Sequence, residues 1–208
     1  MHKKKKLLVC LGLASVALAA SVLAQEVENP YFPTKVGTEW EYRDGNETVR
    51  VQVVGKEMRD VTKVDEDGGE KTYKVTCAKL QMTNGARTQE EIIGVLGDGI
   101  YRFAAAGRDL TPPLQILKLP FRQGSTWEGL AKSEGLILKG AFTCKEEMVA
   151  VPAGEFRALH VACPDFDIGT KKMALDFWFA QDVGIVKQRF KTGSFEKVLE
   201  LKRYKIGK

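Results

Sequence analysis

Outside the first 24 residues, the side chains with catalytic potential are one histidine, His160, and a set of carboxylates. A zinc hydrolase of the His-Glu-x-x-His type needs two histidines on one helix face, and a single histidine cannot supply them. The sequence has no Gly-x-Ser-x-Gly elbow, phosphate-binding loop or recognisable Cys–His arrangement. The enzymatic alternative is a hydrolytic carboxylate pair formed on folding, with the candidates Asp165, Asp167, Asp176 and Asp182. We therefore expect a non-catalytic protein in which His160 is a strand residue on a sheet face.

The cysteines are the second group of residues that could do chemistry, through a disulfide or a metal site. Residues 151–156 (VPAGEF) predict a hairpin with a four-residue loop, which places Cys144 opposite Cys163 and Met148 opposite Leu159. We predict a Cys144–Cys163 disulfide, with Cys77 as a buried free thiol. The alternative is three buried thiols that pack as small hydrophobic groups. No Cys-x-x-Cys pair is present, so we expect no metal site at the cysteines.

Two glycine-containing stretches resemble ligand-binding loops. Residues 65–70 (DEDGGE) are acidic, but an EF-hand needs a glutamate at its twelfth position, and the twelfth residue from Asp65 is Thr76. Gly94, Gly97 and Gly99 lack the spacing of a nucleotide-binding loop, and no helical pattern follows them. We expect a solvated hairpin loop at 65–70, with a cation site as the alternative, and no cofactor.

Residues 1–24 predict a secretory signal peptide. Four lysines, Lys3 to Lys6, precede an apolar run that ends in small residues before Gln25. An uncleaved N-terminal anchor is the alternative. We expect the domain to be residues 25–208 and its location to be periplasmic or secreted.

The positive charge of the chain belongs largely to this segment. The whole sequence has 32 basic and 27 acidic residues. Because Lys3 to Lys6 leave with the signal peptide, the mature chain has 28 basic and 27 acidic residues. A nearly neutral domain gives no support for nucleic-acid binding, and we expect no nucleic-acid partner.

The remaining sequence alternates in short stretches separated by turn residues, for example at 44–46 (DGN) and 84–85 (NG). Expected strands include 38–42, 48–56, 71–82, 89–96, 100–104, 136–148, 156–163, 172–180 and 184–190. We predict an all-β single domain of about eleven antiparallel strands that form a curved sheet, half-barrel or barrel.

Two segments leave a choice open. The proline-bracketed stretch 110–119 fits an edge strand or a loop over an opening in the sheet. Residues 195–206 contain good helix formers, yet the turn residues 192–194 (TGS) favour one more hairpin and therefore a strand.

Four stretches together resemble a group of bacterial secreted and lipoprotein-like domains of unknown function: 29–40 (NPYFPTKVGTEW), 120–127, 151–159 (VPAGEFRAL) and 178–187 (WFAQDVGIVK). More distantly, the layout is similar to LolA-like and DUF3108-like cell-envelope proteins. That resemblance implies a curved antiparallel sheet with a concavity that faces lipid. Those carriers usually cover the sheet with a helix, and this sequence shows no convincing helical pattern.

Two functional hypotheses follow. In the first, the curved sheet binds a lipid or other hydrophobic ligand, and the tentative ligand-binding residues are Trp40, Tyr42, Trp127, Phe177 and Phe179. In the second, these aromatic residues are ordinary core, and the domain binds an envelope protein or a glycan through its edge strands or loops. An open apolar cavity would favour the first hypothesis, and a filled interior would favour the second.

Overall fold

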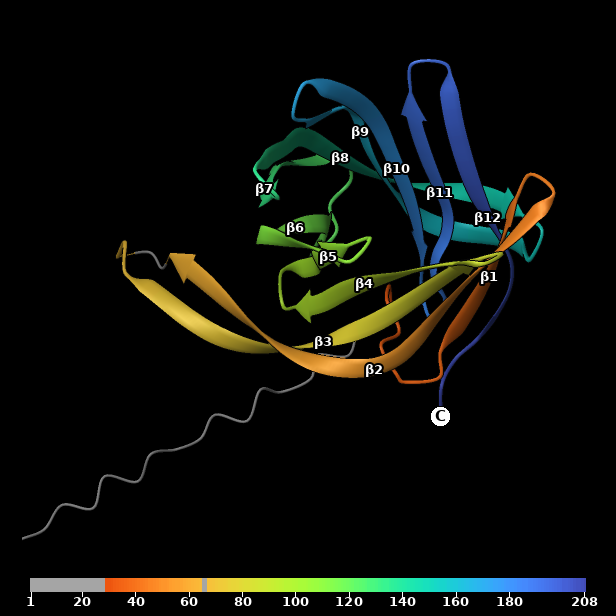
Figure 1. Ribbon diagram of the computed structural model, residues 1–208, viewed down its shortest axis with the longest axis horizontal. Coiled ribbons are helices and arrows are strands. Elements are labelled where there is room, and N and C mark those ends of the chain that lie inside the picture. Colours follow the sequence, from red (N-terminus) through yellow and green to blue (C-terminus); the bar gives the residue numbers. More distant parts are fainter. Residues whose placement is uncertain (1–28, 65–66) are drawn as a thin grey trace, which may run out of the picture.

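The computed structural model describes residues 29–64 and 67–208 (Figure 1), so the predicted signal peptide and part of the acidic loop lie outside the described residues. The described residues form an antiparallel barrel that closes in the order β1-β12-β11-β10-β9-β8-β7-β6-β5-β4-β3-β2. The strands are β1 (Glu39–Asp44), β2 (Glu47–Val64), β3 (Glu70–Asn84), β4 (Arg87–Leu96), β5 (Gly99–Ala105), β6 (Arg108–Lys118), β7 (Ser125–Ser133), β8 (Leu136–Val151), β9 (Gly154–Ile168), β10 (Lys171–Ala180), β11 (Gly184–Thr192) and β12 (Phe195–Lys205). The all-β prediction is confirmed, in its closed-barrel form.

The predicted turns form hairpins at one end of the barrel. Asp44 pairs with Glu47 around Gly45, whose φ is 57°, and Thr192 pairs with Phe195 around Gly193, whose φ is 56°. A two-residue loop with positive φ matches the twist of the flanking strands, and glycine adopts it without steric cost. The second turn makes residues 195–205 a strand, as favoured above, and this strand closes the barrel against β1.

The barrel is least regular between β6 and β7. Their ladder aligns one residue pair, Thr111 with Lys132. Pro112 and Pro113 follow in β6 and have no backbone N–H to donate. A side chain bridges the gap, since the Trp127 Nε1–H donates to the carbonyl of Gln115 across 3.0 Å. The segment 110–119 is therefore an edge-like strand rather than a loop.

The β8–β9 hairpin shows that the predicted cysteine register is wrong by two residues. Val151 pairs with Gly154, so the loop has two residues instead of four, and Cys144 lies opposite Val161 rather than Cys163. Gly154 opens β9 with a φ of 136°, a conformation that glycine tolerates inside a ladder. Met148 is 58% exposed rather than buried, because the buried positions of β8 change from the face of Phe142 and Cys144 to that of Val149.

The three cysteines in the described part of the chain are buried free thiols. The structure therefore contradicts the predicted Cys144–Cys163 disulfide and agrees with the alternative of three packed thiols. The physical reason is the register, because the two thiols come from positions that are not opposite each other.

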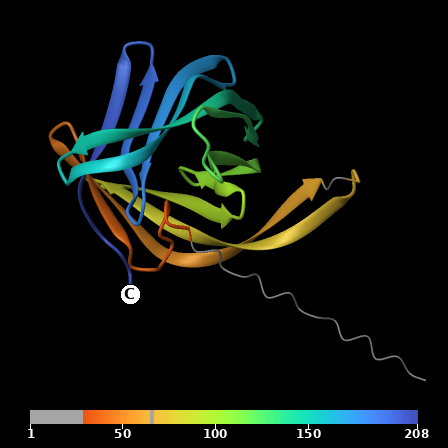
Figure 2. The same ribbon diagram turned by 180° about the vertical axis from the view of Figure 1, so that it is seen from behind.

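The strands β2 and β3 are much longer than the barrel needs. Residues 54–64 and 70–76 continue past it as a curved two-stranded ribbon, here called the arm (Figures 1 and 2). The arm residues pair with each other down to Val64 and Glu70, whereas β4 pairs with β3 only from Cys77 onward. The arm is therefore part of the sheet at its base and has no neighbouring strand among the described residues farther out.

Candidate functional site

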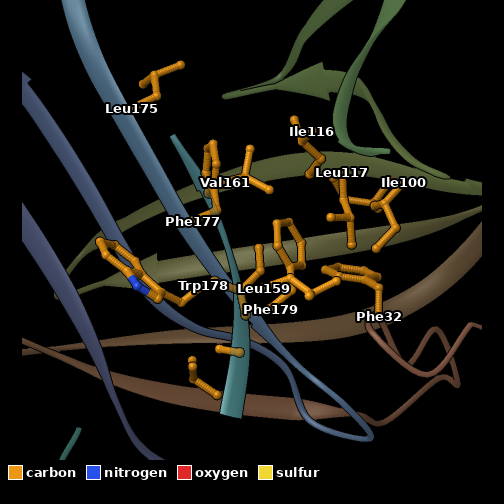
Figure 3. Close-up of a cluster of buried hydrophobic side chains, with 14 of the residues drawn as sticks. Phe32, Ile100, Ile116, Leu117, Leu159, Val161, Leu175, Phe177, Trp178 and Phe179 are labelled. Carbon is orange, nitrogen blue, oxygen red and sulfur yellow. The ribbon is translucent and has the colours of Figure 1, made fainter. Parts of the chain in front are cut away.

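All five aromatic residues proposed as ligand contacts lie in the barrel core. Trp40, Tyr42, Trp127, Phe177 and Phe179 are at most 8% exposed. Figure 3 shows Phe177 and Phe179 among aliphatic core residues, with Trp178 on the other side of β10. They belong to one large core cluster.

The polar atoms of these aromatic residues are bonded within the protein. The Trp40 Nε1–H donates to the carbonyl of Val183 across 2.6 Å, and the Tyr42 hydroxyl donates to the carbonyl of Ile185 across 2.8 Å. Burial raises the pKa of Tyr42, so its hydroxyl stays protonated as a donor. Both bonds tie β1 to the start of β11, which is a structural task.

A small cavity remains beside Trp40 and Tyr42. Its volume is about 20 Å³, and Glu91, Arg102 and Gln188 contribute polar groups to its lining. The Arg102 Nη2 lies 3.4 Å from the Glu91 Oε2, while its buried Nε has no hydrogen-bond partner among the described residues. This space suits one water molecule, which needs such polar partners, and is far smaller than a lipid.

A polar network covers the outer wall of β9–β11. The His160 Nε2 lies 2.8 Å from Asp176 Oδ1, and the His160 Nδ1 lies 3.1 Å from Glu147 Oε1. The ring stacks on Trp178 with centroids 4.1 Å apart, and the Trp178 Nε1–H donates to Glu147 across 2.7 Å. The Arg189 Nε donates to Asp176 Oδ2 across 2.9 Å.

Asp176 is ionised in this network. Burial opposes its ionisation, but hydrogen bonds from His160 and Arg189 outweigh that effect and lower its pKa. Burial likewise opposes ionisation of Glu147, and the hydrogen bonds from Lys145 and Trp178 lower its pKa overall. These carboxylates serve as acceptors for neighbouring donors.

The four candidate carboxylates lie in three different surroundings. Asp176 is hydrogen-bonded to His160. The Lys172 Nζ lies 3.7 Å from Asp165 Oδ1 and 3.6 Å from Asp167 Oδ1. Asp182 lies in the β10–β11 turn. Across residues 29–64 and 67–208, no group of three or more His, Cys, Asp or Glu residues is placed to hold a metal ion. The ring nitrogens of His160 both face carboxylates, which orients the ring as part of a wall.

Another part of the outer wall, beside the base of the arm, is apolar. A second cluster, here called the outer cluster, consists of Val61, Cys77, Ile92, Phe103 and Ala104. It packs between the base of the arm and β4–β5, and Gly94 makes room for it, since a Cβ there would overlap the Phe103 ring.

Beside the outer cluster lies an apolar groove, here called the arm groove. Its volume is about 290 Å³. Its lining is mostly apolar and comes from the arm, β4, β5 and β6, with Val61, Leu96, Tyr101, Phe103, Pro112 and Pro113. Thr62 and Asp98 add polar groups. The prolines put rigid apolar rings at the surface where β6 lacks backbone donors. The groove combines preformed walls with an apolar lining, as binding clefts do.

A larger depression of about 560 Å³ lies at the barrel end crossed by residues 29–35. Asn29, Thr34, Lys35 and Asp182 line it together with Phe32 and two prolines. This mixed lining suits water better than an apolar segment.

Sequence reasoning missed the arm groove, although part of its signal was present. Tyr73, Val75 and Cys77 alternate onto one face of a strand. Finding the groove also required the arm to reach past the barrel and Phe103 to turn to the outer face, which a bulge in the β4–β5 ladder accompanies. The bulge is seen in the pairing of β4 with β5 and could not be read from the sequence.

Comparisons with known proteins show the fold and leave the activity open. No family model matches the chain, and no curated protein matches its sequence. A crystal structure from Bacteroides fragilis NCTC 9343, described as an inferred exported protein with a YmcC-like fold, matches with a TM-score of 0.50 and 14% identity over 84% of this chain and 98% of that one. An inferred lipoprotein from Parabacteroides distasonis ATCC 8503 gives a TM-score of 0.49 and 13% identity over the same shares. In the described part of this chain, no helix has the length and apolarity to cross a bilayer.

Proposed function

We propose that this chain is a non-catalytic extracytoplasmic protein that binds a protein partner through the arm groove. The observation that carries this proposal is the contrast between the buried aromatic core of the barrel and a largely apolar groove open on the outside. Exposed apolar clefts of this kind often serve as contact surfaces, which supports the proposal.

The extracytoplasmic part of the proposal has two supports. The first 24 residues have the basic and apolar pattern of a signal peptide. The structurally similar Bacteroides fragilis protein is described as exported. The non-catalytic part is supported by His160, whose ring nitrogens lie beside carboxylates and therefore have no hydroxyl or thiol to activate.

The hydrophobic-ligand hypothesis stays a prediction. The five aromatic residues that motivated it are buried, and the cavity beside Trp40 and Tyr42 holds about 20 Å³. A lipid would have to displace core side chains, at a cost comparable to overpacking a core by several methylene groups. A protein contact in the arm groove needs no such displacement.

The first experiment introduces a photo-cross-linking amino acid at Pro113 in the arm groove and, as the matched control, at the exposed Leu136 on β8. Both versions are exported in the native host and irradiated. We expect a discrete heavier product from position 113 only. Equal products from both positions, or none from 113, would count against the arm groove.

The second experiment separates the protein-partner proposal from the hydrophobic-ligand hypothesis. Native mass spectrometry is applied to the exported protein purified without detergent. We expect the mass of residues 25–208 alone. A reproducible additional mass that extracts into organic solvent would instead support a bound apolar ligand, and a chain that retains residues 1–24 would contradict signal cleavage.

A further inference from the structure

Two kinds of contact among the described residues tie the arm to the barrel wall. The first is apolar, because Val61 of the arm packs in the outer cluster. The second is an ion pair, in which the Arg59 Nη1 donates to Asp109 Oδ1 near the start of β6 across 3.0 Å. A two-stranded ribbon is marginally stable by itself, so these contacts determine how closely the arm lies against β4–β6.

The ion pair joins the two walls of the arm groove. On β2, Arg59 and Val61 are two residues apart and therefore share a face of the ribbon. On β6, Asp109 pairs with Ala104 of the outer cluster and precedes Pro112, which lines the groove. Arg59 thus reaches from the arm to β6 beside the groove, and the pair limits the distance between the two walls while it is intact.

A second carboxylate orients the guanidinium group. The Arg59 Nε donates to Glu57 on the same strand, and the Nη1 is directed at Asp109. Burial opposes the charge on Arg59, but the hydrogen bonds to Glu57 and Asp109 and the charges of these carboxylates outweigh it and raise the pKa of Arg59. Arg59 is therefore charged and already aimed at β6.

The contribution of this ion pair is moderate, because both side chains are partly exposed. The Arg59 side chain is 33% exposed and the Asp109 side chain is 66% exposed. A pair of this kind shifts an equilibrium by a factor of about two to five and is screened by salt. It therefore favours the closed arm without locking it.

We propose that the Arg59–Asp109 pair is a releasable clasp that holds the arm against the barrel and limits how wide the arm groove opens. The groove volume of about 290 Å³ lies at the lower end of the range of about 300–1,000 Å³ found for ligand pockets. An extended partner segment with more than one large apolar side chain therefore needs the arm to move outward. This last step rests on the proposed function of the groove, whereas the clasp itself does not.

Labelling of Cys77 tests the clasp without a partner, because this thiol lies in the outer cluster under the arm. The test variant is Asp109→Asn, which removes the charge that Arg59 pairs with. Burial, followed by the charges of Glu57, Arg59 and Lys56, shifts the pKa of Cys77. The substitution at position 109 therefore leaves the intrinsic reactivity of the thiol unchanged, and a faster reaction reports a more frequently open arm.

The expected effect is confined to the arm. In Asp109→Asn, we expect Cys77 to label about threefold faster, while Cys144 in the barrel core labels at the wild-type rate. Cys144 thereby shows that the barrel itself is intact. The matched control is Asp60→Asn, which removes a carboxylate paired with Lys74 inside the arm and should leave both rates unchanged.

Salt gives a second test of the same contact. Raising the NaCl concentration from about 0.05 M to about 0.5 M screens an exposed ion pair, so Cys77 labelling should accelerate in the wild-type protein and not in Asp109→Asn. A Cys77 rate that the substitution leaves unchanged, a rate that Asp60→Asn changes equally, or the same salt response in both proteins would overturn the clasp.

Cross-linking from position 113 separates the clasp from the proposed function. In Asp109→Asn, the yield of the cross-linked product should rise about threefold, because the groove opens wide more often. Equal yields from the wild-type protein and the variant would show that the clasp does not limit access to the groove. If neither protein gives a product, the partner proposal fails, and the labelling rates still decide whether the clasp exists.

Discussion

Two parts of the barrel's outer wall differ in polarity. Along β9–β12 and β1, charged groups satisfy one another: Asp176 accepts from His160 and Arg189, and Glu41, 6% exposed, lies under Arg203 and Lys202. Beside the base of the arm, the outer face of β3–β5 instead carries the apolar outer cluster, in which Phe103 is 4% exposed.

This contrast shows which side chains on the outer face of the barrel can be exposed to water and which need to be covered. A wall of paired charges can meet water directly, because its donors have acceptors. An apolar wall has to be covered, and the arm covers only part of it, which leaves the arm groove. The arm groove therefore follows from incomplete coverage of the outer cluster.

The largest expected effect on stability comes from a substitution in the apolar outer cluster. Phe103→Ala removes a ring from the outer cluster and should lower the free energy of unfolding by about 3 kcal/mol. Urea unfolding measures it, with Phe195→Ala as the control, because Phe195 is 60% exposed and should change stability by less than about 0.5 kcal/mol. Equal losses in the two variants would show that the outer cluster is not a packed core.

The stability contributed by the polar network on β9–β11 should depend on pH. Asp176→Asn weakens hydrogen bonds to a charged acceptor and should cost about 2 kcal/mol at pH 7. Because the folded-state pKa of Asp176 lies below its ordinary value of 3.8, the contribution is present above that pH and is lost as the pH falls through the lowered pKa. Urea unfolding from pH 7 down to pH 2 should show the two proteins converge. Asp165→Asn, on an exposed carboxylate, should show no such convergence.

Thiol labelling compares the outer cluster with the barrel interior. Burial raises the pKa of both Cys77 and Cys144 to about 12, so the two thiols are matched in intrinsic reactivity. Cys77 becomes accessible when the arm opens, whereas Cys144 requires the barrel to open, so Cys77 should label about tenfold faster or more. Mass spectrometry of labelled peptides gives the two rates. Equal rates would mean that arm and barrel open together, and a Cys144–Cys163 disulfide in a non-reducing peptide map would contradict the free thiols.

The smallest effect is expected at an exposed ion pair on the arm. The Lys74 Nζ lies 3.1 Å from Asp60 Oδ1, and the two side chains are 69% and 61% exposed. Lys74→Ala should change the free energy of unfolding by roughly 0.3 kcal/mol, as measured by urea unfolding. A loss above about 1 kcal/mol would show that charge pairing, and not the outer cluster, holds the arm.

Local signals in the sequence were enough to establish the fold class and most hairpins. Alternation and glycine turns act over a few residues, so Gly45 and Gly193 could be placed without knowledge of distant contacts. Alternation along the strands predicted that the aromatic side chains face the interior. It could not predict whether they contact a ligand or the side chains of the opposite wall.

The strand register and the closure of the barrel depend on long-range contacts, and the sequence could not supply them. The position of Gly154 in β9 rather than in the loop moved Cys144 away from Cys163, and a shift of this size depends on which long-range pairing buries more surface. The arm groove likewise depends on β6 meeting β5 and on the arm extending past both.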